Sequence, residues 1–410
     1  MKLKYLLLSF LFVSVWSCDN NDDDYEFVQV ATPQLMSKSA FRSSVKIDAP
    51  KTIEAVGKIY VYQDFIFIGD VDAGIHIIDN SNPELPEAIT FIEIPGNEDI
   101  SVKDGFLYAD SATDLVVFDI SDINNVTLVE RLEDVFNVYD YGIPLEADTV
   151  DYGSFNYEDD IIVGWTLATE RRKKVNDDAI FFDTDVLASN VESTIGVGGS
   201  LARFQIVNNY LYAVGNYEMS IFNIQNLKAP VEENTIYAGW NIETMFQAEG
   251  YLYLGSTNGM YIYNLVNPSL PEYVSEFSHW EGCDPVVVDG DYAYVTLRGG
   301  NVCGQLESVL EVIDISDKTT PTLTERYTLE NPYGLGVKGN ILYVCDGTAG
   351  LKLFERETPK DLVLVNTLED VKAKDVIPLE ESLLMIGENT LYQYEYLENN
   401  VKLISAFKLN

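Results

Sequence analysis

Four acidic residues recur at one position of a repeating pattern in this 410-residue chain. Each stands nine residues before an alanine or leucine inside a short apolar segment: Glu98, Glu243, Asp284 and Asp375. The other copies carry different residues there: Lys58, Ala202, Tyr333 and, if one more copy is counted, Glu133. Carboxylates that surround one opening raise one another's pKa or gather cations. We therefore expect a ligand-binding rim that could hold a divalent cation, with the capping of turns by these carboxylates as the alternative.

Basic and aromatic side chains accompany this acidic column. Arg203 directly follows the column position of its copy and, with Lys58, is expected to neutralise part of the rim. Arg298 opens a glycine-rich loop, and His279-Trp280 lies just before a cysteine, so these three residues are further candidate ligand contacts. The chain holds only 2 histidines, so a zinc hydrolase site or a histidine general base has few candidate residues. We predict no dedicated metal site and no catalytic residue.

A repeat positions these residues. One signature has the form of residues 74–83, with apolar residues, then Asp79, Ser81 and Asn82-Pro83, and it returns near residues 115–122, 260–268 and 310–317. A second, shorter strand signal precedes each copy. β-Branched and aromatic residues bounded by turn residues predict strands, and proline ends them because it cannot donate to a sheet. Four strands per unit, repeated along a chain, are typical of an all-β propeller.

The number of blades depends on one long interval. The anchor residues of the second strands are spaced near 40 residues apart: Phe67, Leu107, Leu211, Leu252, Ala293, Leu342 and Leu384. The step from Leu107 to Leu211 is about 100 residues. Segments 133–136, 161–165, 179–182 and 193–196 have strand character, so we favour eight blades with a divergent third blade. Seven blades with an insertion is the alternative.

These units resemble the LVIVD repeats of bacterial and archaeal surface proteins. The resemblance covers residues 58–408, and segment 283–298 is similar to the Bacteroidetes branch of that family. It implies a surface propeller without a defined molecular role, and it supplies no catalytic residues.

Three cysteines lie in the expected propeller body. Cys283 would lie in the loop that enters one blade, and Cys303 in the loop between the second and third strands of the same blade. These loops emerge on one face, so a Cys283–Cys303 disulfide is feasible, and Cys345 in the next blade is a rival partner. Three free thiols are the alternative. A three-cysteine metal site is weaker, because no paired CxxC spacing exists.

The N-terminus has the features of an exported lipoprotein. Residues 1–17 combine Lys2 and Lys4 with an apolar stretch and are expected to be a signal peptide. Cys18 is the expected lipidation site, and residues 18–44 form an acidic tether and N-terminal segment before a propeller at 45–410. We expect an outer-membrane protein exposed at the cell surface, with inner-membrane retention as the alternative.

The charge of −40 limits the partners, because it repels nucleic acids and anionic lipid surfaces. We expect a monomer that contacts the membrane through its anchor alone. Its predicted role is a non-catalytic binding or scaffolding module for a protein or a glycan. The alternatives are a hydrolase or lyase that uses rim carboxylates, possibly with a divalent cation, and a structural envelope protein.

Overall fold

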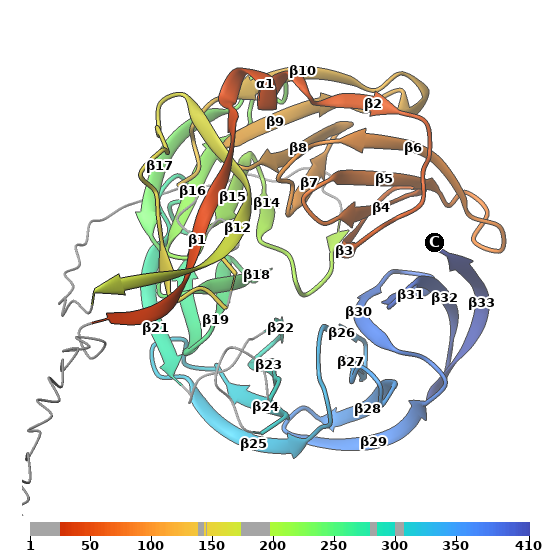
Figure 1. The fold of residues 1–410 in the computed structure, drawn as a ribbon. Coiled ribbons are helices and arrows are strands. Elements are labelled where there is room, and N and C mark those ends of the chain that lie inside the picture. Colours follow the sequence, from red (N-terminus) through yellow and green to blue (C-terminus); the bar gives the residue numbers. More distant parts are fainter. Residues whose placement is uncertain (1–24, 138–142, 145, 174–196, 279–284, 300–306) are drawn as a thin grey trace, which may run out of the picture. The chain divides into compact units, whose positions relative to one another are not determined.

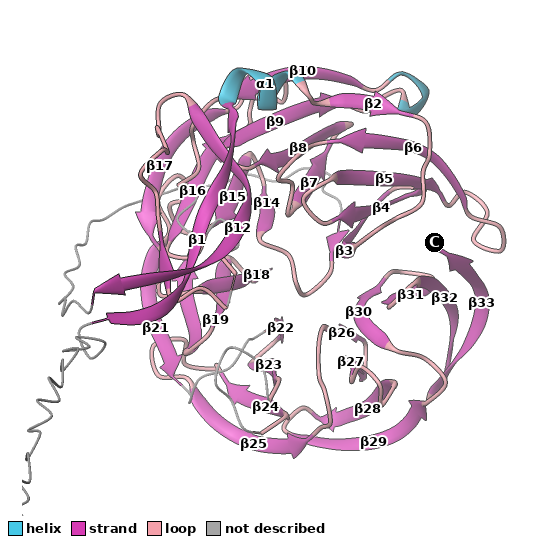
Figure 2. Ribbon diagram, viewed as in Figure 1, coloured by secondary structure: helices cyan, strands magenta, loops and turns pink. Residues whose placement is uncertain are grey.

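The computed structural model describes residues 25–137, 143–144, 146–173, 197–278, 285–299 and 307–410 (Figure 1). Contacts divide the chain into two units, Met1–Lys38 with Asp140–Phe181, and Ser39–Tyr139 with Phe182–Asn410. The regular secondary structure of the described residues is almost entirely β-strand, with one short α-helix, α1 (Lys38–Ser43) (Figure 2). Within these ranges, no helix has the length and apolar character needed to cross a membrane.

The larger unit contains seven sheets that follow one another around a ring (Figure 1). Blade 1 holds β3 (Val56–Tyr62), β4 (Phe65–Asp70), β5 (Gly74–Asp79) and β6 (Glu87–Glu93). Blade 2 holds β7 (Ile100–Lys103), β8 (Phe106–Ser111), β9 (Asp114–Asp119) and β10 (Thr127–Leu132). Blade 3 holds β14 (Phe204–Val207), β15 (Tyr210–Val214), β16 (Glu218–Asn223) and β17 (Val231–Tyr237).

The remaining blades repeat this strand order. Blade 4 holds β18 (Ile242–Ala248), β19 (Tyr251–Ser256), β20 (Gly259–Asn264) and β21 (Glu272–Ser278). Blade 5 holds β22 (Val286–Asp289), β23 (Tyr292–Leu297), β24 (Val309–Asp314) and β25 (Thr322–Thr328). Blade 6 holds β26 (Leu335–Lys338), β27 (Ile341–Cys345), β28 (Leu351–Thr358) and β29 (Asp361–Leu368). Blade 7 holds β30 (Ala373–Pro378), β31 (Ser382–Gly387), β32 (Thr390–Leu397) and β33 (Asn400–Lys408). The all-β propeller expected from the sequence is therefore confirmed.

Blade 1 is extended at both of its edges. β2 (Lys46–Asp48) pairs with β6 on the outer side, and β13 (Val197–Gly198) pairs with β3 on the inner side. The sheet therefore has six strands in the order β13-β3-β4-β5-β6-β2.

The smaller unit corrects the expected third blade. Its three-stranded sheet joins β1 (Tyr25–Ser37), β11 (Thr149–Val150) and β12 (Asp160–Lys173), with β1 and β12 antiparallel along most of their length. Segment 161–165 thus pairs with the N-terminal strand instead of with neighbouring blade segments. Segment 133–136 forms no strand, and segments 179–182 and 193–196 lie outside the described residues. The described strands therefore form eight sheets, of which seven follow the blade pattern, as in the alternative with an insertion.

The repeated sequence signatures have direct structural roles. The aspartate that ends the third strand accepts a hydrogen bond from the serine amide two residues later, at 2.8 Å for Asp79 and 2.9 Å for Asp314. The tyrosine of the second strand is buried and donates to a backbone carbonyl of the next blade. These bonds measure 2.9 Å from Tyr108 to Leu227 and 2.7 Å from Tyr212 to Pro268. In these repeats the aspartate fixes its own turn, and the tyrosine, where it has an acceptor, ties the blade to its neighbour.

The ring closes between blades 1 and 7 through side chains. Ile66 and Ile78 of blade 1 pack in one apolar cluster with Leu384 and Leu391 of blade 7. The Ile53 amide donates to the Leu409 carbonyl at 3.0 Å. Among the described strands, none of blade 7 pairs with a strand of blade 1. The four repeated strands of every blade therefore come from one continuous stretch of chain, and only the added strand β13 of blade 1 comes from a distant segment.

Candidate functional site

The segment 197–203, which we call the central segment, crosses the middle of the ring before β14 begins (Figure 1). Val197 and Gly198 pair with β3 in blade 1. The Ser200 hydroxyl accepts from the Leu335 amide of blade 6 at 2.9 Å, and the Ala202 carbonyl accepts from the Met245 amide of blade 4 at 2.7 Å. Blades on several sides of the ring thus share one piece of chain at their inner edges.

Asp375, one of the expected rim residues, lies beneath this segment and is only 1% exposed. Its Oδ1 atom accepts from the Ser200 hydroxyl at 3.1 Å, whereas Oδ2 is buried without a hydrogen-bond partner. Burial raises the pKa of Asp375 to about 7. A Cβ atom on Gly199 or on Gly334 would overlap with this carboxylate, so glycines let the backbone close over it. Asp375 therefore holds the central segment and has no space beside it for a ligand.

Asp99, which sequence reasoning did not select, anchors the other end of the central segment. Its Oδ2 atom accepts from the backbone amides of Arg203 and Phe204, the latter at 3.2 Å. The Lys58 ammonium lies 3.1 Å from the same oxygen. Lys58 therefore neutralises Asp99, a carboxylate that the nine-residue spacing could not identify because it lies one position beyond Glu98.

Glu98 and Arg203 form an ion pair at the rim. Arg203 also donates through Nη2 to Asn216 at 2.9 Å and to the Ile242 carbonyl at 3.3 Å. The surrounding protein raises the pKa of Glu98 by desolvation, but Arg203 and Lys58 outweigh this effect and lower it below the ordinary value. The Glu98 side chain remains 52% exposed, so the pair can still meet a ligand from solvent.

The other two described rim candidates belong to the same charge network. Burial raises the pKa of Glu243, and the positive charges of Arg203 and Arg298 oppose this shift. The Arg298 guanidinium lies over the Tyr333 ring, 4.3 Å from its centre. The structure thus brings Glu98, Arg203, Glu243 and Arg298 together. The described part of the rim therefore carries charges of both signs.

Sequence reasoning missed an aromatic pair beside Arg203. Tyr217 and Trp240 flank Asn216 and Ile242, and their rings meet edge to face with centres 5.1 Å apart. Trp240 is 40% exposed and lies in a turn where Gly239 and Asn241 both have positive φ. The sequence offered one clue. This tryptophan lies in a polar loop between two strand signals, so burial within a strand does not account for it.

Several candidates lie elsewhere or outside the described residues. Glu133 does not join the rim, because its carboxylate binds Arg42 of α1 at 2.7 Å. Cys345 is a free, buried thiol, so it is not the rival disulfide partner, and burial raises its pKa. The remaining candidates lie outside the described residues: Cys18, His279, Trp280, Cys283, Asp284 and Cys303. The Cys283–Cys303 disulfide and the lipidation of Cys18 stay predictions.

The described part of the rim offers little to a metal ion. Within the described residues, no three or more His, Cys, Asp or Glu side chains gather closely enough to hold one. The rim carboxylates that remain have cationic or amide partners, and these compete with a divalent cation.

Comparison with known proteins supports the repeat and the fold. The model of the LVIVD repeat matches residues 55–89, 97–134 and 283–329. The chain contains LVIVD repeats. The matched segments correspond to blades 1, 2 and 5, and the other blades have the same strand order.

Solved structures show a similar propeller fold at low sequence identity. The periplasmic gluconolactonase PpgL of Pseudomonas aeruginosa has a TM-score of 0.53 at 10% identity, with 86% of this chain and 96% of that chain covered. The computationally designed protein Ika8 has a TM-score of 0.50 at 9% identity, with 86% and 87% covered. Such likeness shows the propeller fold alone. A search of curated proteins gives no match.

Proposed function

We propose that this propeller is an exported, lipid-anchored surface module that binds a glycan or a protein through its charged rim, without catalysing a reaction. The observation that carries the proposal is the state of the rim carboxylates. Asp99 is bound by Lys58 and two amides, Asp375 is enclosed, and Glu98 is paired with Arg203. The hydrolase or lyase alternative relies on two rim carboxylates that face a shared space, so this arrangement favours recognition over that alternative.

The patch formed by Glu98, Arg203, Asn216, Tyr217 and Trp240 has the chemistry of a recognition surface. An exposed aromatic ring offers a flat apolar face, and the adjacent ion pair and amide offer donors and acceptors. Sugars present apolar C–H faces, which can lie on the aromatic ring, and hydroxyl groups, which can bind the donors and acceptors. This patch therefore favours a glycan. A protein partner that contributes a polar loop is the second possibility within the same proposal.

The position of the patch on one face of the ring allows a matched control. Tyr217 lies in the connection between β15 and β16, and Trp240 lies in the connection between two blades. In an antiparallel meander these two kinds of connection emerge on the same face, whereas the connection between third and fourth strands emerges on the other. Val266 lies in such an opposite connection and is 85% exposed.

The test is binding of the purified protein to an immobilised glycan panel and to surface extracts of its own cells. Trp240→Ala is expected to weaken the affinity for the captured glycan or protein at least tenfold, or about 1.4 kcal/mol. Exposed aromatic side chains contribute most of the binding free energy at such surfaces. Val266→Ala is the control and should bind like the unmodified protein. Equal binding by Trp240→Ala and the unmodified protein, or turnover of a captured glycan, would contradict the proposal.

The membrane anchor is a separate part of the proposal. The apolar stretch before Cys18 and the acidic residues after it support export and lipidation. Cys18→Ala is expected to lose palmitate labelling and to leave the membrane fraction, while Cys345→Ala keeps both. Membrane association of unlabelled Cys18→Ala protein would refute a lipid anchor without affecting the rim.

A further inference from the structure

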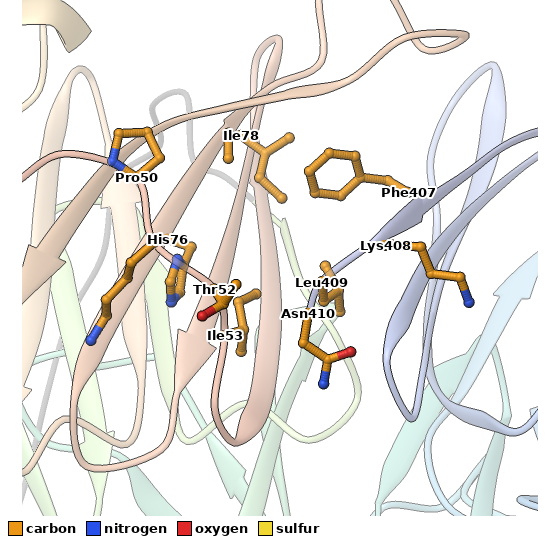
Figure 3. A pocket seen from close by; sticks show the side chains of 11 residues that line it. Pro50, Thr52, Ile53, His76, Ile78, Phe407, Lys408, Leu409 and Asn410 are labelled. Carbon is orange, nitrogen blue, oxygen red and sulfur yellow. The ribbon is translucent and has the colours of Figure 1, made fainter.

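A cavity of about 430 Å³ lies where blades 1 and 7 meet (Figure 3). Residues 50–53, together with His76 and Ile78 of β5, line one side, and Phe407 to Asn410 at the end of β33 line the other. This volume lies within the usual range for small-molecule sites. The charged rim described above contributes no residue to it.

Most of the cavity wall is apolar. Ile53, Ile78 and Leu409 are at most 4% exposed and belong to the cluster that closes the ring. The Phe407 ring packs against the same cluster and faces the Ile78 side chain (Figure 3). The Ile53–Leu409 backbone hydrogen bond fixes the two sides at 3.0 Å. A ligand here would bury a hydrocarbon body against a preformed wall.

One end of the cavity is polar and is built from buried groups. The His76 side chain is 2% exposed, and its Nε2 atom lies 3.2 Å from Asp70 Oδ2. Asp70 also accepts from the Glu54 and Ala55 amides, so its oxygens act as acceptors and Nε2 carries the proton. Nδ1 has no hydrogen-bond partner among the described residues. Nδ1 is therefore a hydrogen-bond acceptor, so the charge that would hold an anion at this end must come from a neighbouring lysine.

Positive charge accompanies this buried histidine. The Lys51 ammonium lies 3.8 Å from the centre of the Phe91 ring, and the His76 ring lies 4.6 Å from that same ring. Burial is the largest effect on the pKa of His76 and lowers it. Asp70 opposes this shift, and the positive charge of Lys51 adds to it. Lys408, also at the cavity, donates to the Thr390 hydroxyl at 2.9 Å. Neither lysine has a carboxylate partner within the described residues.

Unpaired cations at an apolar cavity stand out in a chain with 66 acidic and 26 basic residues. We propose that this cavity binds a small amphipathic carboxylate, whose hydrocarbon body lies against Ile78, Phe407 and Leu409 and whose carboxylate meets Lys51. Charge complementarity selects the anion, because a cationic or neutral head would leave Lys51 without a partner. The apolar wall selects against fully polar anions such as phosphate.

The experiment is isothermal titration of the full chain with octanoate, octan-1-ol and octylammonium as probes. Octanoate is expected to bind at least tenfold more tightly than octan-1-ol, and octylammonium is expected to bind least. Lys51→Met should reduce octanoate affinity to that of octan-1-ol, because it removes the charge and keeps the hydrocarbon. Lys402→Met, which changes an exposed lysine of blade 7 paired with Glu395, is the charge control and should bind normally.

A second variant tests the cavity itself. Ala88→Phe places a ring in the cavity and is expected to abolish binding of both octanoate and octan-1-ol, with the folded state checked by circular dichroism. Equal affinities for octanoate and octan-1-ol, absence of octanoate binding, or equal losses in Lys51→Met and Lys402→Met would each overturn the proposal. The cavity proposal and the rim proposal are tested separately, because Trp240→Ala changes the rim and no residue of the cavity.

Discussion

Blades 6 and 2 place an aspartate at the same position and give it different surroundings. Asp346 directly follows β27 and Asp110 lies near the end of β8, and both accept hydrogen bonds from two successive amides of the incoming loop. Six residues later blade 6 has Lys352, which pairs with Asp346, whereas blade 2 has Val116. Burial, with help from Glu98, raises the pKa of Asp110 to about 7.

The comparison shows that blades can share one backbone hydrogen-bond arrangement and still differ in the charge beside it. The backbone cap is common to both blades and to Asp70 of blade 1, where His76 occupies the position of Lys352. The residue six positions later decides whether the carboxylate is paired. A repeat can therefore conserve a turn while one substitution changes its response to pH.

The largest effect is expected from Lys352→Met. This variant leaves the Asp346 carboxylate, which is 0% exposed, without its counter-ion, and such a loss typically costs about 3 kcal/mol. Urea denaturation measures the change in the free energy of unfolding. The double variant with Asp346→Asn should recover a large part of it, and a double variant no more stable than Lys352→Met would argue against the pairing.

A smaller, pH-dependent effect is expected from Asp110→Asn. Because the folded pKa of Asp110 is raised to about 7, the folded state holds a proton that the unfolded chain releases near pH 4. This group therefore lowers stability as pH rises between these values. Asp110→Asn should stabilise the protein more at pH 8 than at pH 5, with a difference of about 2 to 3 kcal/mol between the two pH values. Denaturation curves at both pH values measure this, and an unchanged pH slope would contradict the raised pKa.

The smallest effect is expected from the tyrosines that join neighbouring blades. Tyr294 donates to the Pro359 carbonyl at 2.9 Å, whereas the buried Tyr253 hydroxyl has no partner among the described residues. Tyr294→Phe should cost about 1 kcal/mol, and Tyr253→Phe should be neutral or slightly stabilising. Thermal denaturation distinguishes them, and equal losses would mean that the Tyr253 hydroxyl finds an acceptor in solution.

Local sequence patterns were enough to locate the blades. Each anchor residue, from Phe67 to Leu384, lies in the second strand of a blade, because alternation and turn residues act within a few positions. The segment at 160–173 has the same local character, yet it pairs with β1. Strand pattern does not specify a distant partner, so this sheet could not be predicted from periodicity.

The sequence predicted acidic residues with Arg203 and Lys58 among them, but not the specific partner of each charge. Glu98 and Glu243 lie where the nine-residue spacing placed them. Their neighbours include Arg203, which reaches them because the central segment crosses the ring. Asp375 shares the spacing but is covered by that same segment. A long-range backbone path decides which members of a repeated column reach solvent.

The closure between blades 1 and 7 has a consequence for the order of the chain. Since each blade is contiguous, its strand pairings do not depend on where the polypeptide starts. A circular permutant opened at an exposed connection between two blades, such as that near Trp240 between β17 and β18, would keep every blade contiguous and so keep every within-blade ladder of the ring. For the same reason, duplication or deletion of one blade would change the number of blades and leave the strand order of the other blades unchanged.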